Sequence, residues 1–153
     1  MKKMTALRTH LANLGCFNAG ALEAWVEDMT LKSRGKKHGE AVLLHTLRYQ
    51  AVFAIDQYPY KRHPVEMFNA ALMTWLAEHD DRSQLSDPDP DIGVDVFDDD
   101  TAGLEISLSF EEDVFIIPDE QGMIDFLGER WSLQDPELWV AESGELDSRT
   151  TDG

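Results

Sequence analysis

The sequence contains one cysteine and no long hydrophobic segment. Cys16 alone cannot form an internal disulfide or a zinc site built from several cysteines, and it fits a reducing compartment. No apolar run approaches the roughly 20 residues that a membrane-spanning helix needs. Polar residues interrupt the basic start, Met1–Gly15, where a secretory signal has its continuous apolar stretch. We therefore expect neither a membrane segment nor a signal peptide.

Basic residues are scarce in the second part of the chain. The formal net charge is −17. Residues 1–62 carry 10 Lys or Arg against 5 Asp or Glu, whereas residues 63–153 carry 3 against 25. Such a surface repels nucleic-acid phosphates and anionic membranes. Three explanations stay open: solubility alone, self-assembly of a basic face with an acidic face of a neighbouring copy, and an acidic wall that nucleic acid passes without sticking.

The sequence also lacks a recognisable catalytic motif. Its five histidines lie in separate segments without the H-E-x-x-H spacing of a zinc protease. There is no G-x-S-x-G and no phosphate-binding glycine loop, because "GKKHGE" follows no strand-to-helix pattern and is more simply a solvated turn. We therefore predict no catalytic residue, no cofactor and no metal site, and a protein that is not an enzyme.

Three consecutive aspartates, Asp98, Asp99 and Asp100, are the sharpest local feature. Consecutive side chains of an extended chain point to opposite faces, so they converge poorly on one cation. The following residues also lack the central glycine of a calcium-binding loop. Aspartate accepts the backbone angles of turns, and Gly103 loosens the corner. We predict that the three aspartates form the tip of a hairpin, and alanine substitutions would test the alternative of a metal-dependent enzyme.

Hydrophobic periodicity predicts helices at residues 5–14 and 64–80. The second begins at Pro64, which suits the first helical position. Its apolar stripe consists of Val65, Phe68, Leu72, Trp75 and Leu76. Strands are predicted at residues 21–33, 41–56, 92–97 and 104–110, with a helix at 19–28 as an alternative for the first, a polar turn at 33–40, apolar segments at 114–118 and 123–128, and a short strand at 138–141.

The order of these elements predicts an α+β fold, with a mostly antiparallel sheet packed with two or three helices. Residues 1–142 are expected to form a single domain, and residues 143–153 a polar C-terminal tail. Four aromatic residues, Trp25, Phe68, Trp75 and Phe110, fall on apolar faces and are predicted to lie in the core. Trp131 and Trp139 could dock on this domain or on a neighbour.

Five segments resemble, in order, a known family. They are "MKKMTALRTHL", the strand "LRYQAVFAID", the helix "VEMFNAALMTWLAEHD" with its Trp-Leu pair, the hairpin "VDVFDDDTAGLEISLSFEEDVFI" and the ending "ELWVAESGEL". Together they resemble the tail completion protein R of temperate contractile-tailed phages, which is related in role to tail terminators. The resemblance extends to about Leu146. The segment Cys16–Gly39 and the corner Phe110–Glu112 depart from the family pattern.

The resemblance implies a tail-terminator-like fold and a structural role. Such a protein caps the tail tube as a six-fold ring when the tail reaches its length, and it offers a surface to the head-side connector. The implied partners are further copies in a hexameric ring, the tail tube protein with the sheath protein as a further candidate, and the head–tail connector. DNA would pass through without specific binding. The implied location is the virion tail, after assembly in the cytoplasm of the bacterial host.

An alternative function is a small acidic binding module, such as a nucleic-acid mimic or an immunity-type protein acting on a basic partner. For a ring, the basic stretch Lys32–Lys37 could meet the acidic corner Glu111–Asp113 of the next subunit. The predicted subunit or partner contacts are Lys32, Arg34, Lys36, Lys37, Glu111, Glu112, Asp113, Trp131 and Trp139.

Overall fold

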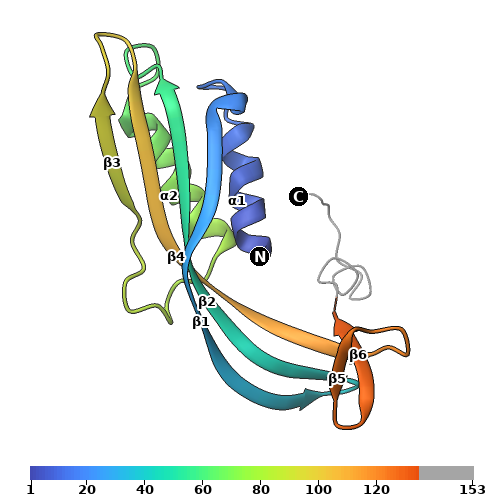
Figure 1. Ribbon diagram of the computed structural model, residues 1–153. Coiled ribbons are helices and arrows are strands. Elements are labelled where there is room, and N and C mark those ends of the chain that lie inside the picture. The colour runs from blue at the N-terminus through green and yellow to red at the C-terminus, as the bar shows by residue number, and fades with distance from the viewer. Residues whose placement is uncertain (135–153) are drawn as a thin grey trace. The chain divides into compact units, whose positions relative to one another are not determined.

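The computed structural model describes residues 1–134 (Figure 1). Two helices and six strands make up these residues, and they confirm the predicted α+β class. The strands run in the order β1-β2-β4-β6-β5, and β3 pairs with β4 beside this path. The elements are α1 (Lys2–Ala12), β1 (Leu22–His38), β2 (Ala41–Tyr58), α2 (Val65–His79), β3 (Asp91–Val96), β4 (Ala102–Pro118), β5 (Ile124–Phe126) and β6 (Glu129–Leu133), with a short 3-10 turn at Ala19–Ala21.

The described residues form two compact units. The first contains Met1–Thr30 and Arg48–Glu112, and the second contains Leu31–Leu47 and the described residues from Asp113 onward. Strands β1, β2 and β4 each contribute residues to both units. The single domain over residues 1–142 stays a prediction, and the tail at 143–153 lies outside the described residues. No helix within residues 1–134 is long and apolar enough to cross a membrane.

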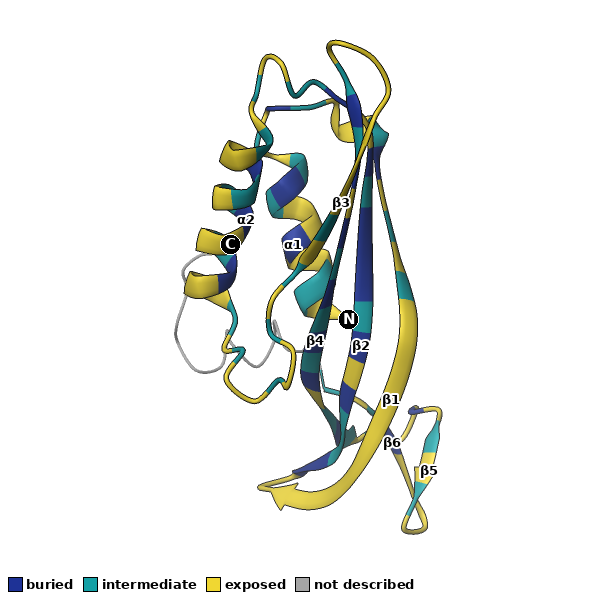
Figure 2. Ribbon diagram, turned by 90° about the vertical axis from the view of Figure 1, so that its left-hand side faces the viewer, coloured by how far each residue is buried: buried dark blue, intermediate teal, exposed yellow. Residues whose placement is uncertain are grey.

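The core of the first unit lies between its two helices and its strands. Figure 2 shows α1 and α2 on one side of β2 and β4, with buried residues on the facing surfaces. Alternate residues of each strand face the helices because side chains of an extended chain alternate between the two faces. The buried residues are Leu7 and Leu11 of α1, Phe68, Leu72 and Leu76 of α2, Tyr49, Ala51, Phe53 and Ile55 of β2, and Leu104, Ile106, Leu108 and Phe110 of β4.

Glu112 of β4 anchors the beginning of α1. Its buried carboxylate accepts hydrogen bonds from the backbone N–H groups of Lys2 (3.0 Å) and Lys3 (2.9 Å) and from the Tyr49 hydroxyl (2.5 Å). Helix N-termini carry unpaired N–H groups and a partial positive charge, which a carboxylate satisfies. Burial raises the pKa of Glu112, but the hydrogen bonds from Tyr49, Lys3 and Lys2 outweigh it, so the pKa lies below its ordinary value. Glu112 therefore stays ionised at neutral pH.

Arg82 ties the segment after α2 to the sheet. Its guanidinium donates to the backbone oxygens of Pro88 (2.6 Å) and Ser109 (2.8 Å) and pairs with Asp80 (2.8 Å). Asp80 also pairs with Lys3 of α1 (2.6 Å). Arginine suits this position because its planar fork can satisfy several acceptors at once. The prolines of the segment disfavour a helix there. The contacts of Arg82 hold the segment against the sheet instead.

The first hairpin differs from its prediction at its turn. The polar turn expected at residues 33–40 is wrong for most of its length, because β1 continues to His38 and only Gly39 and Glu40 connect it to β2. Gly35 lies inside β1 with a φ of +63°, a backbone angle that glycine adopts readily. It therefore marks an irregularity within the strand and not a turn. The alternative helix at 19–28 is also wrong. Its residues enter β1 after the short 3-10 turn.

Two aromatic predictions for the core also need correction. Trp25 is 37% exposed, and its indole N–H donates to Glu27 (3.0 Å) on the same strand. It is exposed because β1 is the terminal strand of the sheet, with no strand of residues 1–134 beyond it. Trp75 of α2 is half-buried and stacks on His10 and His79, with ring centroids 5.8 and 4.9 Å apart. Phe68 and Phe110 are fully buried, as predicted. Pro64 caps α2 rather than occupying its first turn.

The second unit has a small apolar cluster of its own. Trp131 of β6, 6% exposed, packs there with Val42 and Ile116, and Leu44, Ile124 and Phe126 pack against them. The Trp131 indole N–H donates to the Phe126 backbone oxygen (2.8 Å). The predicted segments at 104–110 and 114–118 join as the single strand β4, and β6 was not predicted. Trp139 and the strand expected at 138–141 lie outside the described residues.

Candidate functional site

The described histidines and acidic residues do not gather into a metal site. Among residues 1–134, no group of three or more His, Cys, Asp or Glu side chains is placed to hold a metal ion. His10 and His79 stack on Trp75, and His38 packs edge-on against Phe115 with ring centroids 5.4 Å apart. Burial lowers the pKa of His10, which favours its neutral form in this stack.

Asp98, Asp99 and Asp100 lie at the turn between β3 and β4. Asp98 Oδ1 accepts hydrogen bonds from the N–H groups of Asp100 (2.8 Å) and Thr101 (2.7 Å) and from the Thr101 hydroxyl (3.1 Å). These bonds, led by the N–H of Asp100, lower the pKa of Asp98. The Asp98 carboxylate is thus occupied with closing the turn. The side chains of Asp99 and Asp100 are exposed at the same tip.

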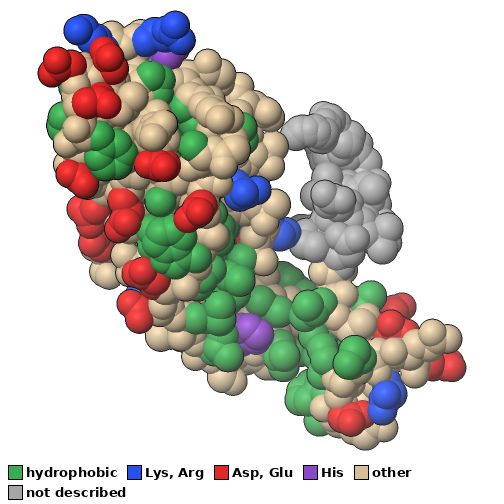
Figure 3. Space-filling model, turned by 45° about the horizontal axis from the view of Figure 1, so that its top comes forward, with side chains coloured by type: hydrophobic (Ala, Val, Ile, Leu, Met, Phe, Trp, Pro, Cys, Tyr) green, Lys and Arg blue, Asp and Glu red, His purple; other side chains and the backbone are tan. Residues whose placement is uncertain are grey.

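The turn continues an acidic surface along β3, which we call the acidic edge and define as Asp91, Asp95, Asp98, Asp99 and Asp100. All five are exposed, and β3 pairs with β4 alone among the described strands. Ser83–Glu129 contains 15 Asp or Glu and no Lys or Arg, so no basic residue of this long segment offsets the charge. Figure 3 shows acidic side chains interspersed with hydrophobic ones over this part of the molecule.

Exposed valines share the acidic edge. Val94 is 52% and Val96 is 61% exposed. Both alternate with polar residues along β3, a pattern that usually indicates burial on one face of a strand. Their partners across the ladder, Leu104 and Ala102, are buried. The difference arises because β3 is an edge strand with no described neighbour beyond it. The sequence pattern shows that the valines share a face, but it does not show that the strand lies at an edge.

The first strand of the strand order, β1, carries a basic surface. We call it the basic arm and define it as Lys32, Arg34, Lys36 and Lys37 of β1. Every residue from Glu27 to Glu40 is exposed, and β1 pairs with β2 alone among the described strands. None of the four basic residues forms an ion pair with another residue in the described part of the chain. The basic arm is therefore not neutralised by ion pairs within residues 1–134.

The acidic corner at Glu111–Asp113 is engaged within its own chain. Glu111 binds the Arg48 guanidinium (3.0 Å to Nε), and Asp113 accepts from the Thr46 hydroxyl (2.7 Å). Glu112 is buried at the start of α1, as described above. Glu112 and Trp131 are buried within their own chain, so a partner subunit that contacted them would have to displace their present neighbours. A contact through Glu111 or Asp113 stays a prediction.

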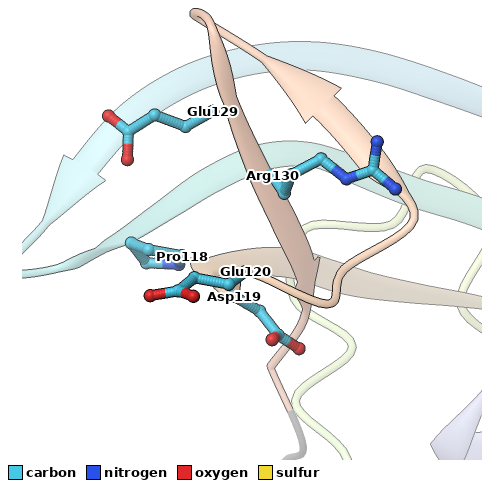
Figure 4. Close-up of a pocket in the computed structure, with 5 residues that line it drawn as sticks. All are labelled: Pro118, Asp119, Glu120, Glu129 and Arg130. Atoms are coloured by element: carbon cyan, nitrogen blue, oxygen red, sulfur yellow. The ribbon is translucent and has the colours of Figure 1, made fainter.

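A shallow hollow of about 570 Å³ lies in the second unit. Pro118, Asp119, Glu120, Glu129 and Arg130 line it (Figure 4). Glu129 and Arg130 point away from each other, so the hollow does not bring the guanidinium and this carboxylate together. Arg130 Nε donates to the Gly122 backbone oxygen (2.9 Å) and helps to hold the turn before β5. The hollow is thus built from structural turn contacts.

Comparison with known proteins identifies the family of the chain. The family model for the P2 phage tail completion protein R (GpR) matches residues 1–136. The chain belongs to this family. The family is a structural phage tail family, so the protein is a tail component of the virion, as the sequence segments implied.

One curated relative is a phage protein. It is described as an uncharacterized 19.2 kDa protein in the rep-hol intergenic region of Haemophilus phage HP1 (strain HP1c1). The two sequences are 26% identical over 125 residues, which is 80% of this chain and 75% of the relative. No solved structure matches the chain at a significant level.

Proposed function

We propose that this tail completion protein caps the tail tube as a ring of identical subunits, six in number, and so ends tail elongation. The same ring would present the surface that the head-side connector joins. The observation that carries the proposal is the family match, which covers every described residue. Assembly would take place in the cytoplasm of the bacterial host, with the tube protein as the first partner and the sheath protein as a further candidate.

Charge separation supports a ring. The basic arm lies on β1, at one end of the strand order, and the acidic edge lies along β3, which pairs with β4 beside that order. Two different surfaces that complement each other make a head-to-tail contact, and repeated head-to-tail contacts close into rings when the rotation permits. A symmetric dimer, in contrast, would place like-charged surfaces together if it used either of these edges alone.

The acidic excess supports a passage for DNA. A polyanion binds to surfaces rich in Lys and Arg and releases counterions as it does so. The long segment Ser83–Glu129, with 15 acidic residues and no basic one, offers DNA no such partner. If part of this segment lines the ring, DNA would pass without being held. The alternative of a nucleic-acid mimic fits less well, because the exposed basic arm would itself repel a basic target.

Deletion of the gene from the phage or prophage that carries it tests the proposal. Electron microscopy after induction should show overlong or ragged headless tails together with full heads that remain unattached. A plasmid copy of the wild-type chain should restore joined particles. Normal infectious particles from the deletion strain would contradict the capping function, and a pull-down for a basic partner at low and high salt would then test the acidic binding module.

A further inference from the structure

Two edge strands of the described sheet, β1 and β3, match each other in strand pattern as well as in charge. In β1, Lys32 and Arg34 share one face, and Leu31 and Ser33 share the other, because successive side chains alternate. In β3, Asp91 and Asp95 share one face, and the exposed Val94 and Val96 share the other. Pairing of the two strands would therefore place basic against acidic residues on one face. Leu31 would meet the valines on the opposite face.

Backbone groups on both edges are available for such pairing. Each edge strand pairs on one side only among the described strands, which leaves a row of N–H and C=O groups without a strand partner. An extended strand from another chain can complete such a row, and alternate side chains then supply specificity. The six residues of β3 and the first residues of the basic arm are long enough for a short ladder. Gly35, with φ of +63°, marks where regular pairing would end.

The remaining acidic surfaces fit the basic arm less well. The corner at Glu111–Asp113 is engaged by Arg48, by the start of α1 and by Thr46. The β5–β6 hairpin exposes Asp125 and Glu129, but β5 has three residues and Arg130 adds a positive charge between them. Edge strands commonly carry lysines that prevent association with unrelated chains. A strongly acidic edge strand can still pair with such a strand, because its carboxylates attract the lysines.

We propose that the basic arm of one copy pairs with the acidic edge of the next copy, so that β1 and β3 of neighbouring subunits form one continuous ladder. Lys32 and Arg34 then lie on the same face of the ladder as Asp91 and Asp95, and Leu31 lies on the same face as Val94 and Val96. This contact deepens the proposed function, because it rests on a ring of copies and assigns the surfaces that join them. It also replaces the acidic corner at residues 111–113 as the acceptor.

Charge exchange tests the contact. One variant reverses the arm (Lys32→Glu/Arg34→Glu), and a second reverses the edge (Asp91→Lys/Asp95→Lys). Each should weaken self-association, measured by native mass spectrometry at low salt, by on the order of 100-fold, because like charges would face each other. Thermal melts check that both variants fold. An equal mixture of the two should associate again, since each variant's altered surface then meets a matching surface on the other.

Two further measurements separate the possible failures. A matched reversal at Asp125→Lys/Glu129→Lys should leave association within about threefold of the wild type, because these residues lie outside the proposed contact. Mixed Arg34→Cys and Asp95→Cys chains should form a disulfide-linked heterodimer under mild oxidation, while the native Cys16 is buried and does not interfere. Unchanged association of the arm or edge variant, no restoration in the mixture, or no heterodimer would overturn the contact. The deletion phenotype reports on capping independently of these results.

Discussion

The buried carboxylate of Glu112 joins three elements of the first unit. It accepts from the first N–H groups of α1, lies on β4 and binds the hydroxyl of Tyr49 on β2. Burial and the neighbouring carboxylate raise the pKa of Tyr49, so that hydroxyl remains a donor at neutral pH. In a chain with 30 acidic residues, Glu112 thus has a structural role that its neighbours do not share.

We predict that Glu112→Gln lowers the free energy of unfolding by about 1–3 kcal/mol, because a charged acceptor and one of its hydrogen bonds are lost in a buried site. The matched control is Glu111→Gln, whose side chain is partly exposed beside Arg48 and should cost less than about 1 kcal/mol. Urea denaturation of both variants measures the difference. Equal effects would contradict the anchoring role of Glu112.

The effect of Glu112 should depend on pH in a defined direction. Its folded pKa lies below the ordinary value of 4.5, so the ionised form is favoured in the folded state. The contribution is therefore complete above about pH 4.5 and is lost as the pH falls through the folded value. The gap in unfolding free energy between wild type and Glu112→Gln should shrink on acidification. A gap that widens in acid would show the opposite sign of the pKa shift.

Single residues were predictable from sequence where burial follows from helical periodicity. Phe68 and Leu72 were expected on the apolar stripe of α2, and both are fully buried. Trp25 was predicted to lie in the core but is exposed, because the alternating pattern of a strand does not reveal whether another strand lies beside it. Glu112 could not be distinguished from its acidic neighbours, since its burial depends on a helix about 110 residues earlier in the chain.

The β5–β6 hairpin has an unusual residue in its turn. Phe126 pairs with Glu129, so Leu127 and Gly128 form a two-residue loop, and their φ angles are +52° and +76°. Positive φ at both central positions is the pattern of a type I′ turn, which prefers Asn-Gly. Leucine is disfavoured there because its side chain crowds the backbone in the left-handed region. Leu127 is also 71% exposed, so burial does not offset this cost.

Replacing Leu127 by asparagine is therefore expected to stabilise the protein by about 1 kcal/mol, since asparagine tolerates the left-handed region better. The matched control is Met123→Asn. Met123 is 93% exposed with no positive φ, and its replacement should change stability by less than about 0.5 kcal/mol. Thermal unfolding of both variants measures the change. A loss of stability in Leu127→Asn would show that the leucine makes a stabilising contact at this tip.

Elements were predictable where their periodicity was unbroken. The α2 helix and the β2 strand match their predicted residues within two positions at each end. The end of β1 was missed because Gly35, Lys36 and Lys37 together read as a turn, although the strand continues through them. The length of β4 was missed for the opposite reason. Its acidic residues Glu111–Asp113 look like a break in the sequence, but each of them has a hydrogen-bond partner on another element, and Glu112 is buried.

Charge distribution is the property of the whole molecule that the sequence reveals most directly. Counting residues separated a basic first part from an acidic second part, and the structure adds that the two charges reach exposed edge strands. The structure shows that Glu111, Glu112 and Asp113 already have partners within the chain, which favours β3 as the proposed acceptor for the basic arm. The sequence identifies the excess of acidic residues, but it does not show which carboxylates are free to bind a partner.

Salt should therefore affect folding and assembly in opposite directions. With a net charge of −17, the monomer repels itself, and raising NaCl from 10 to 150 mM shortens the screening length from about 30 Å to about 8 Å. Screening of this repulsion should stabilise the folded monomer. Each kcal/mol added to the free energy of unfolding would raise the midpoint of thermal unfolding by about 2–4 °C. Self-association through the arm and the edge should weaken over the same range, because that contact depends on attraction between opposite charges.

The edge-reversed variant, Asp91→Lys/Asp95→Lys, is the matched control for both effects. It is less negative than the wild type, so its thermal midpoint should respond less to salt. Mixed with the arm-reversed variant, it should show association that weakens with salt as in the wild type. Melting curves and native mass spectrometry on the same samples measure the two trends. Assembly that strengthens with salt would point instead to an apolar contact, for which Leu31, Val94 and Val96 would be the first residues to substitute.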